Sequence, residues 1–248
     1  MCHDVHPRLL AVLVFAVAIF VFGCGYCLLS PRNPKHVYTF GRLFGKLHKL
    51  FGIKLDLRLP ENAHDFGPCV FIANHQSNWD LVTISNAVTP GAVTVGKKSL
   101  KWLPVFGQLY WLTGNIMIDR NNRSRAIGTI GQVIDKIKED KVSVWLFPEG
   151  TRSRGRGLLP FKTGAFHAAV GAGVPIVPIV CSSTAGLKAG KWDNGHVIVE
   201  MLEPISTEGY GKDGIRELSK KCHDLMQAKL AELDEEVARL NGAEKQTA

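Results

Sequence analysis

Between residues 54 and 242, short apolar runs alternate with longer segments that carry apolar residues at helical spacing. An uninterrupted apolar run of about four to eight residues is typical of a strand buried on both faces. Such strands alternating with helices predict an α/β domain with a central, largely parallel sheet flanked by helices. The predicted strands are Lys54–Leu59, Cys69–Ala73, Ala92–Val95, Asn115–Ile118, Val142–Phe147, Ile176–Val180 and Val197–Leu202.

The segments between these runs predict helices. The last helix is rich in Lys, Glu and Ala, and Asn241 and Gly242 suit a C-cap at its end. We expect the tail 243–248 to fray. The predicted helices are Trp79–Ala87, Arg123–Lys138, Lys162–Ala172 and Asp213–Leu240.

A 21-residue run without a charged side chain, Leu9–Leu29, precedes this domain. A helix of about 20 apolar residues can cross the hydrocarbon core of a bilayer. A cleaved signal peptide is the main alternative, but Arg8 is the one basic residue before the run and no small-residue cleavage pattern is present. We therefore predict a retained membrane helix, which either spans the bilayer or enters one leaflet. The positive-inside rule places the rest of the chain in the cytoplasm, because the run is followed by Arg32, Lys35, Arg42, Lys46 and Lys49.

The next segment, Tyr38–Ile53, carries its apolar residues on one helical face and its cations on the other. Beside a membrane helix, this pattern is typical of a helix that lies among anionic headgroups. A helix docked on the protein core gives the same pattern, and we favour the membrane because the preceding helix already holds the segment there. The aromatic segment 100–111 fits either the headgroup level or the core.

The 248-residue chain has a formal net charge of +8 and a sequence pI of about 9.2. This balance indicates an anionic partner, such as anionic lipid or a phosphorylated substrate. Nucleic acid is the weakest option, because the cations are dispersed and no nucleic-acid module is visible. The six cysteines are scattered, and the pair Cys24 and Cys27 lies in the apolar run without a second ligand pair. We predict no metal site and no disulfide framework.

Candidate chemistry first appears at residues 74–80, Asn-His-Gln-Ser-Asn-Trp-Asp, directly after a predicted strand. On one helix His75 and Asp80 would lie roughly 140° apart, so they meet only if His75 lies in the turn and Asp80 in the helix that follows. Ser77 and Asn78 are good N-cap residues for such a break. The pair would then be an imidazole base held by a carboxylate. The alternative is a polar turn that only satisfies backbone groups.

Three further segments follow or end predicted strands. Residues 114–120 end in Arg120, residues 147–153 read Phe-Pro-Glu-Gly-Thr-Arg-Ser, and residues 174–180 are apolar with two prolines. Gly150 lets a ligand approach the backbone closely. Arg120 and Arg152 offer planar guanidinium groups that suit a phosphate, although each arginine alone is more often a surface charge.

Together these segments resemble the four sequence blocks of the glycerolipid acyltransferase family, and within it the bacterial 1-acylglycerol-3-phosphate acyltransferases. Block one is residues 74–80, with histidine, four residues and aspartate. Block two is residues 114–120, block three is residues 147–153, and block four is residues 174–178. The resemblance covers roughly residues 35–205, and blocks one and three together are highly specific.

The pattern of the chain and the resemblance together predict three parts: a membrane anchor with an interfacial helix over residues 1–53, a catalytic domain over residues 54–242 and a tail over residues 243–248. The resemblance implies that His75 is the general base for the acceptor hydroxyl and that Asp80 orients it. The choice between Lys97 and Lys98 as a phosphate ligand stays open, because Ser99 stands where the family has an acidic residue. Lys162 lies just beyond block three and is either a further phosphate ligand or a surface lysine at a helix start. The implied substrate-binding residues are Glu149, Gly150, Thr151, Arg152, Arg120 and Lys98.

The implied reaction transfers an acyl group from acyl-CoA or acyl-carrier protein to the sn-2 hydroxyl of lysophosphatidate, making phosphatidate. The implied co-substrate is the thioester itself, with no metal or other cofactor. The implied location is the inner membrane, with the catalytic domain facing the cytoplasm. The alternatives are an acyltransferase for another lysolipid or glycerol-3-phosphate, a thioester hydrolase that uses His75 and water, and a non-catalytic lipid-binding membrane protein.

Overall fold

The computed structural model describes residues 5–104, 106–118 and 123–247. This part of the chain forms a seven-stranded sheet in the order β1-β7-β6-β2-β5-β3-β4. The pair β1 and β7 runs antiparallel to the remaining strands, which are parallel to one another. The α/β fold class and all the predicted strands are confirmed. The strands are β1 (Ile53–Arg58), β2 (Val70–Ala73), β3 (Ala92–Lys97), β4 (Ile116–Ile118), β5 (Ser143–Leu146), β6 (Ile176–Cys181) and β7 (Gly195–Met201).

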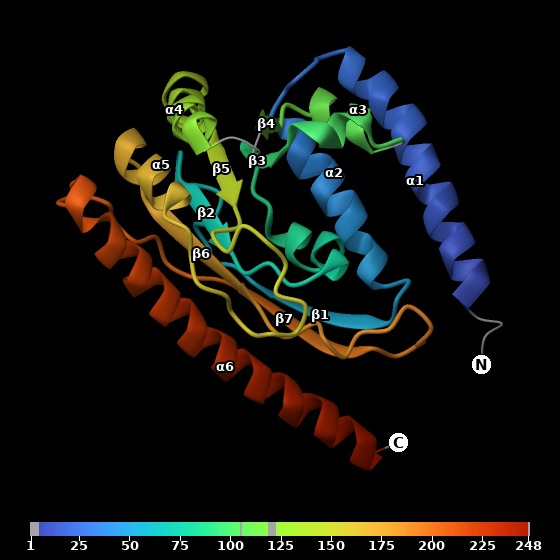
Figure 1. Cartoon of the computed structure of the whole chain (residues 1–248). Helices are drawn as coiled ribbons and strands as arrows, with labels where there is room; N and C mark the ends of the chain where they lie inside the picture. The colour runs from blue at the N-terminus through green and yellow to red at the C-terminus, as the bar shows by residue number, and fades with distance from the viewer. Residues whose placement is uncertain (1–4, 105, 119–122, 248) are drawn as a thin grey trace.

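Helices cover both faces of the sheet (Figure 1). On one face α5 and α6 pack with α4, and on the other lie α2 and the short turns after β2. The helix α1 lies outside α2 and α3. The helices are α1 (Val5–Leu28), α2 (Lys35–Gly45), α3 (Gly107–Leu112), α4 (Arg123–Asp140), α5 (Gly164–Ala172) and α6 (Ile215–Thr247). Short 3-10 turns are η1 (Lys46–His48), η2 (Asn78–Leu81), η3 (Ile84–Ala87), η4 (Lys98–Trp102) and η5 (Lys212–Gly214).

The core centres on β2 and β6, in which every residue is buried. Strands covered on both faces must be apolar throughout, which explains why these two read as uninterrupted apolar runs. The register of β2 aligns Ile72 with Leu146 of β5 and with Pro178 of β6. The carboxyl ends of these three neighbouring strands therefore meet at one edge of the sheet, and blocks one, three and four come together there.

The prediction of one helix over Trp79–Ala87 is wrong. The segment forms the two separate 3-10 turns η2 and η3. Hydroxyl and amide side chains compete here for backbone carbonyls: Thr83 Oγ1 donates to the carbonyl of Trp79, and Asn86 Nδ2 donates to that of Val82. A regular helix is thereby replaced by tight turns that leave Asp80 close to β2.

The predicted C-cap at Asn241 and Gly242 is also wrong, because α6 continues to Thr247. The side chain of Asn241 has a tertiary role instead. Its Oδ1 accepts a hydrogen bond of 2.9 Å from the backbone N–H of His196. This bond holds the end of α6 at the start of β7.

The apolar face of the segment 38–53 packs against the rest of the protein. The helix α2 ends at Gly45, and Leu47 and Phe51 belong to the same core as the sheet. Phe40 packs with Ile19 of α1 and Leu109 of α3. The alternative, a helix docked on the core, therefore describes this segment. Gly45 permits the contact, since a Cβ there would lie 2.4 Å from Oδ1 of Asn86.

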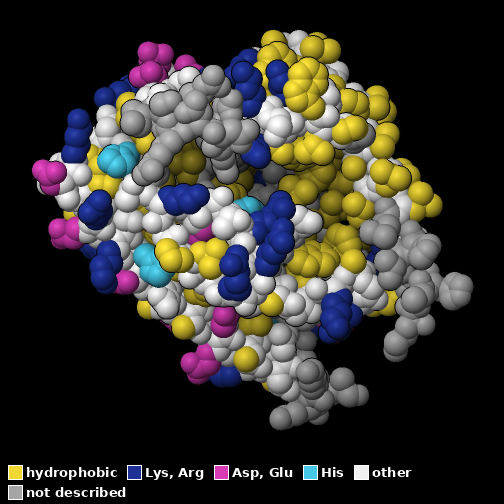
Figure 2. Space-filling view, viewed as in Figure 1, with side chains coloured by type: hydrophobic (Ala, Val, Ile, Leu, Met, Phe, Trp, Pro, Cys, Tyr) yellow, Lys and Arg dark blue, Asp and Glu magenta, His cyan; other side chains and the backbone are white. Residues whose placement is uncertain are grey.

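The helix α1 has one packed face and one exposed apolar face. Phe15 meets Phe44 edge-on, and Gly23 lies against the Phe40 ring. The stretch Leu10–Leu28 is long and apolar enough to cross a membrane. In Figure 2 apolar side chains cover this side of the molecule. The exposed apolar residues at and just beyond α1 are Leu10, Leu13, Val14, Val17, Val21, Phe22, Tyr26, Leu28 and Leu29.

The aromatic segment 100–111 has both exposed and buried side chains, so neither the headgroup level nor the core describes all of it. Trp102 and Trp111 are exposed, whereas Leu109 is buried. Phe106 and Tyr110 stack on each other at 5.5 Å between ring centroids and line the cavity of the candidate site. The segment is therefore partly cavity wall and partly exposed surface beside α1.

Candidate active site

The structure brings His75 and Asp80 together at the carboxyl end of β2. The distance from Nδ1 of His75 to Oδ2 of Asp80 is 2.6 Å. Because an ionised carboxylate only accepts hydrogen bonds, the imidazole carries its proton on Nδ1 and leaves Nε2 as an acceptor. Asp80 is buried, and the same Oδ2 accepts a second hydrogen bond from the backbone N–H of Gln76 at 2.9 Å. The carboxylate therefore fixes both the imidazole ring and the turn that carries it.

The local sequence explains this turn. Ser77 is in extended conformation and caps η2, since its Oγ accepts from the backbone N–H of Trp79 at 3.1 Å. The residues on either side of His75 point toward β6. Asn74 exchanges two hydrogen bonds with the backbone of Cys181, and Gln76 donates to the carbonyls of Cys181 and Ser182. These side chains therefore shape the turn that carries His75.

Block three forms the adjacent side of the site. The ring of Phe147 stacks on the imidazole of His75 at 4.1 Å between centroids. Both oxygens of Glu149 accept hydrogen bonds from backbone N–H groups, that of His75 at 2.6 Å and that of Leu159 at 2.9 Å. Burial raises the pKa of the Glu149 carboxyl above its ordinary value, and the two N–H donors oppose this rise. The side chain does not line the cavity, so the structure does not bring it to the position expected for a substrate ligand.

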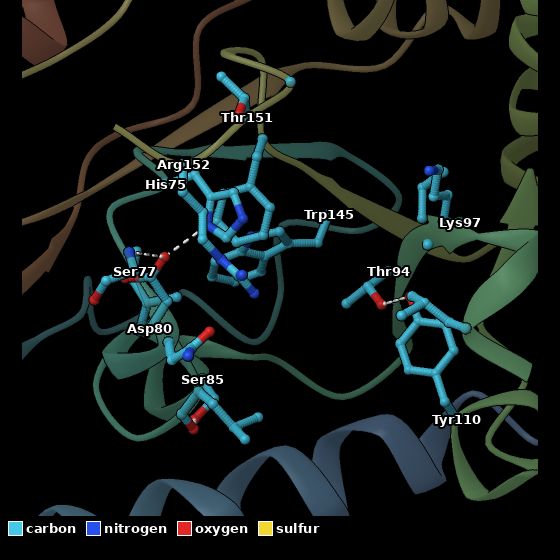
Figure 3. Close-up of a pocket in the computed structure, with 18 of the residues that line it drawn as sticks. His75, Ser77, Asp80, Ser85, Thr94, Lys97, Tyr110, Trp145, Thr151 and Arg152 are labelled. Carbon is cyan, nitrogen blue, oxygen red and sulfur yellow. Dashed lines mark hydrogen bonds and ion pairs between the residues drawn. The ribbon is translucent and has the colours of Figure 1, made fainter. Parts of the chain in front are cut away.

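A cavity of about 810 Å³ opens beside His75. Figure 3 shows His75, Asp80 and Arg152 on one side of it, and Lys97, Thr94 and Tyr110 on the other. In the space-filling view, Lys and Arg side chains border a hollow with an apolar lining (Figure 2). The apolar lining residues include Leu81, Ile84, Val88, Val95, Leu100, Phe106, Tyr110, Trp145 and Phe147.

The predicted ligand residues divide into those that reach the cavity and those that do not. Gly150, Thr151 and Arg152 line it, as the resemblance implies. Lys97 lines it, whereas the expected Lys98 does not. Lys97 is the last residue of β3 and Lys98 the first of η4. Of the two lysines, Lys97 is the one at the cavity wall, and a phosphate-binding role for either stays a prediction.

Lys162 and Arg120 are the remaining predicted cations. Lys162 is exposed, and its amine rests against Gly150, where a Cβ would lie 2.8 Å from Nζ. Arg120 lies outside the residues that the structure describes. Arg154, which the sequence did not single out, lines the cavity. It has a positive φ of 52°, and its backbone N–H donates to the carbonyl of Gln76 at 3.0 Å. A non-glycine residue held in this conformation is a signal of function, but it appears only in the structure.

A second feature that sequence reasoning missed is a polar network in the cavity wall. Oγ1 of Thr94 lies 2.5 Å from the hydroxyl of Tyr110 and donates to Oδ1 of Asn115 at 2.8 Å. Asn115 is buried, and its amide donates to the carbonyl of Tyr110 at 3.1 Å. The network ties α3 to β3 and fixes the Tyr110 ring at the cavity.

The buried cysteines at the two ends of the central strands are poor nucleophiles. Burial raises the pKa of the Cys181 thiol and raises the pKa of Cys69 to about 12. A thiol with so high a pKa is almost entirely protonated at neutral pH, and the thiolate is the reactive form. Within the described ranges, no cluster of three or more His, Cys, Asp or Glu side chains could hold a metal ion.

Fold and site together define an α/β protein with a ligand cavity at the carboxyl ends of parallel strands, the usual position in open sheets. The family described as Acyltransferase matches residues 54–182. The chain belongs to this acyltransferase family and is an enzyme of that class.

Individual relatives match most of the chain. The 1-acyl-sn-glycerol-3-phosphate acyltransferase of Escherichia coli strain K12 is 57% identical over 96% of this chain and 98% of its own length. The enzyme of that name from Haemophilus influenzae is 52% identical over 94% and 98%. The crystal structure of the 1-acyl-sn-glycerophosphate acyltransferase PlsC from Thermotoga maritima superposes with a TM-score of 0.71 at 26% identity, covering 92% of this chain and 96% of that one.

Proposed function

We propose that this enzyme transfers an acyl group from a thioester to the free sn-2 hydroxyl of 1-acylglycerol-3-phosphate, making phosphatidate for phospholipid synthesis. The observation that carries the proposal is the His75–Asp80 pair, which opens onto a cavity that is apolar on one part of its wall and cationic on another. A lysophosphatidate has the matching chemistry, since it joins an acyl chain to a phosphate through one free hydroxyl. The names of the relatives that cover nearly the whole chain support the same substrate.

The chain's own groups provide the proton transfer. Nε2 of His75 takes the proton from the acceptor hydroxyl while that oxygen attacks the thioester carbonyl, which gives a tetrahedral intermediate. The intermediate collapses with cleavage of the carbon–sulfur bond, and the proton on Nε2 passes to the departing thiolate. Asp80 stabilises the imidazolium between these steps, as the acid does in hydrolytic triads. The acceptor oxygen is the nucleophile, so the step requires no serine or cysteine.

The cations of the cavity would bind the anionic parts of the two substrates. Arg152 of block three and Lys97 lie on opposite sides of the cavity (Figure 3), and Arg154, the residue after block three, also lines it. A guanidinium can hold a phosphate with two parallel hydrogen bonds, whereas a lysine acts as a point charge. The CoA and carrier-protein donors also carry phosphate, and we propose either as the acyl donor.

The membrane would be the source of the acceptor and the destination of the product. Each methylene removed from water contributes about 0.8 kcal/mol, so neither lipid dissolves readily. The exposed apolar face of α1 would enter the bilayer. At its amino end α1 is fixed by Arg8, whose guanidinium lies 3.5 Å from the Trp192 ring centroid and donates to the carbonyl of Ala189 at 3.2 Å. A helix packed along the domain in this way favours insertion into one leaflet over a perpendicular span.

We further propose that this leaflet belongs to the inner membrane and that the catalytic domain faces the cytoplasm. The cations that follow α1 support this orientation under the positive-inside rule. A cytoplasmic thioester donor would then reach the cavity directly from solution.

The test is a substrate panel on the purified enzyme in vesicles. Lysophosphatidate, other lysolipids and glycerol-3-phosphate are each offered with one acyl donor, and the donors are then varied with the best acceptor. We expect lysophosphatidate to give the highest kcat/KM. A different best acceptor would contradict the substrate assignment, and thiol release without any acceptor would identify a hydrolase. An enzyme inactive throughout, but able to bind lipid, would favour the non-catalytic alternative.

A further inference from the structure

We infer that Glu149 is a positioning residue that holds the backbone of His75, and that it does not bind a substrate. The inference rests on the proposed function, and it gives the buried carboxylate of Glu149 a specific structural role in the site. Glu149 lies in block three, three residues beyond the end of β5, and His75 lies two residues beyond the end of β2.

The first step of the argument is the register of the sheet. Strands β2 and β5 are parallel neighbours that align Val70 with Val144 and Ile72 with Leu146. Continuing this register beyond the last pair places His75 opposite Glu149, since both pairs differ by 74 positions. The two residues therefore meet because the strands end together, without any need for a ligand between them.

The second step is that the carboxylate is buried and already hydrogen-bonded to the main chain through both oxygens. Its Oε1 accepts from the N–H of His75 and its Oε2 from the N–H of Leu159, at 2.6 Å and 2.9 Å. The residue is 3% exposed. A substrate in the cavity does not meet this side chain, because Glu149 is not among the residues that line the cavity.

The third step is that neighbouring backbone groups hold the other side of His75. The N–H of Ser153 donates to the carbonyl of His75 at 2.8 Å, and the N–H of Arg154 donates to the carbonyl of Gln76 at 3.0 Å. Segment 149–154 thus binds the peptide groups both before and after His75. Asp80 fixes the ring, and Glu149 with its neighbours fixes the Cα from which the ring projects.

The hydrogen bond from the N–H of Leu159 gives the Glu149 carboxylate a second structural role. Residues 155–158 lie between the backbone hydrogen bonds of Arg154 and Leu159, with Gly155 and Gly157 at positive φ. Glu149 therefore closes the base of the loop that carries Arg152 and Arg154 to the cavity. Losing the carboxylate would loosen His75 and this loop together.

The experiment compares Glu149→Gln with Glu203→Gln, which makes the same chemical change at an exposed site. In Glu149→Gln one oxygen becomes an NH₂ donor, so either the His75 or the Leu159 N–H loses its acceptor. We expect kcat to fall at least about 10-fold, since a displacement of about 1 Å can cost 10²-fold, with the lysophosphatidate KM within about twofold of wild type. We also expect faster hydrogen exchange at the His75 or Leu159 amide, with unchanged exchange in β6.

A second variant separates position from charge. Glu149→Asp keeps the negative charge but is one methylene too short to reach both N–H groups, so we expect it to lose kcat as Glu149→Gln does. A raised acceptor KM with unchanged kcat, wild-type kinetics in both variants, or lost activity with unchanged amide exchange would overturn the inference. Global unfolding of both variants would also overturn it, because the carboxylate would then serve the whole fold. The exchange measurement needs no substrate, so it stands apart from any failure of the proposed reaction.

Discussion

Asp80 Oδ2 receives three hydrogen-bond donors from the turn that it belongs to: Nδ1 of His75 at 2.6 Å, the N–H of Gln76 at 2.9 Å and the N–H of Ser77 at 3.3 Å. The imidazole and the turn backbone are therefore fixed by one atom. A five-residue separation that a regular helix would place on different faces becomes a contact because η2 is a tight turn capped by Ser77. The ring cannot rotate about its Cα without breaking the bond to Asp80.

This relationship predicts distinct losses in two variants. His75→Ala removes the base, and we expect kcat to fall about 10²- to 10⁴-fold. Asp80→Asn keeps the size of the side chain, but its NH₂ would favour the tautomer with the proton on Nε2, so Nε2 could no longer accept a proton. We expect a loss of similar order in steady-state assays. Asp213→Asn, at an exposed position in η5, is the matched control and should retain activity. Wild-type turnover in the double variant of His75 and Asp80 would contradict the mechanism.

The central strands β2 and β6 are predictable from sequence because they are buried on both faces and appear as uninterrupted apolar runs. The turns after β2 are less predictable. The side chains of Thr83, Ser85 and Asn86 donate hydrogen bonds to backbone carbonyls and so compete with a regular helix. The spacing of apolar residues does not reveal this competition. The amphipathic segment 38–53 is ambiguous for another reason. Its apolar face has the same pattern against a protein core as against a membrane, and only tertiary packing distinguishes the two.

The candidate site is likewise predictable from the sequence only in part. The spacing of His75 and Asp80 predicts their contact, because the chain between them is short. The choice between Lys97 and Lys98 depends on where β3 ends, and a shift of one residue moves a side chain to the other face of a strand. The task of Glu149 depends on the pairing of β2 with β5. That pairing joins segments 74 residues apart, so no local pattern reveals it.

Arg152 provides a test of phosphate binding in the cavity. A hydrogen bond to a charged group contributes about 1.5–3 kcal/mol, so we expect Arg152→Gln to raise the lysophosphatidate KM about 10- to 100-fold. This rise in KM should be absent when an uncharged monoacylglycerol is the acceptor, however slowly that acceptor reacts. Arg216→Gln on the exposed face of α6 is the control for the change in net charge. An equal rise in KM with the charged and the uncharged acceptor would show that Arg152 does not bind the acceptor phosphate.

The exposed face of α1 provides a test of membrane binding. Phe22 is 77% exposed at the centre of that face, and burying a phenylalanine side chain contributes about 1.5–3 kcal/mol. We expect Phe22→Asp to weaken binding to anionic phospholipid vesicles at least about 10-fold in a flotation assay. Leu225→Asp, at a 41% exposed position on α6, should float like wild type. If the two variants float equally, α1 does not provide the membrane contact.

Arg58 and Glu236 provide a test of how α6 is held on the sheet. The guanidinium of Arg58 in β1 donates to both oxygens of Glu236 in α6, at 2.9 Å and 2.6 Å. This pairing holds the pKa of the Glu236 carboxyl below its ordinary value of 4.5. A carboxyl with a lowered folded-state pKa stabilises the fold above the unfolded-state value, and the stabilisation is lost as pH falls through the folded-state value. The relevant window therefore lies below about pH 4.5.

We expect Glu236→Gln to lower the Tm at pH 7, and the difference from wild type to shrink as the pH falls below about 4.5. Raising the salt concentration at pH 7 should also shrink it, because exposed charges are screened. Glu235→Gln, at the neighbouring exposed position, should show neither effect. Thermal unfolding followed by circular dichroism across pH 3–8 makes the comparison. A Tm difference that stays constant through the acid range would mean that the Gln side chain perturbs packing, and that the charge of Glu236 does not hold α6 to β1.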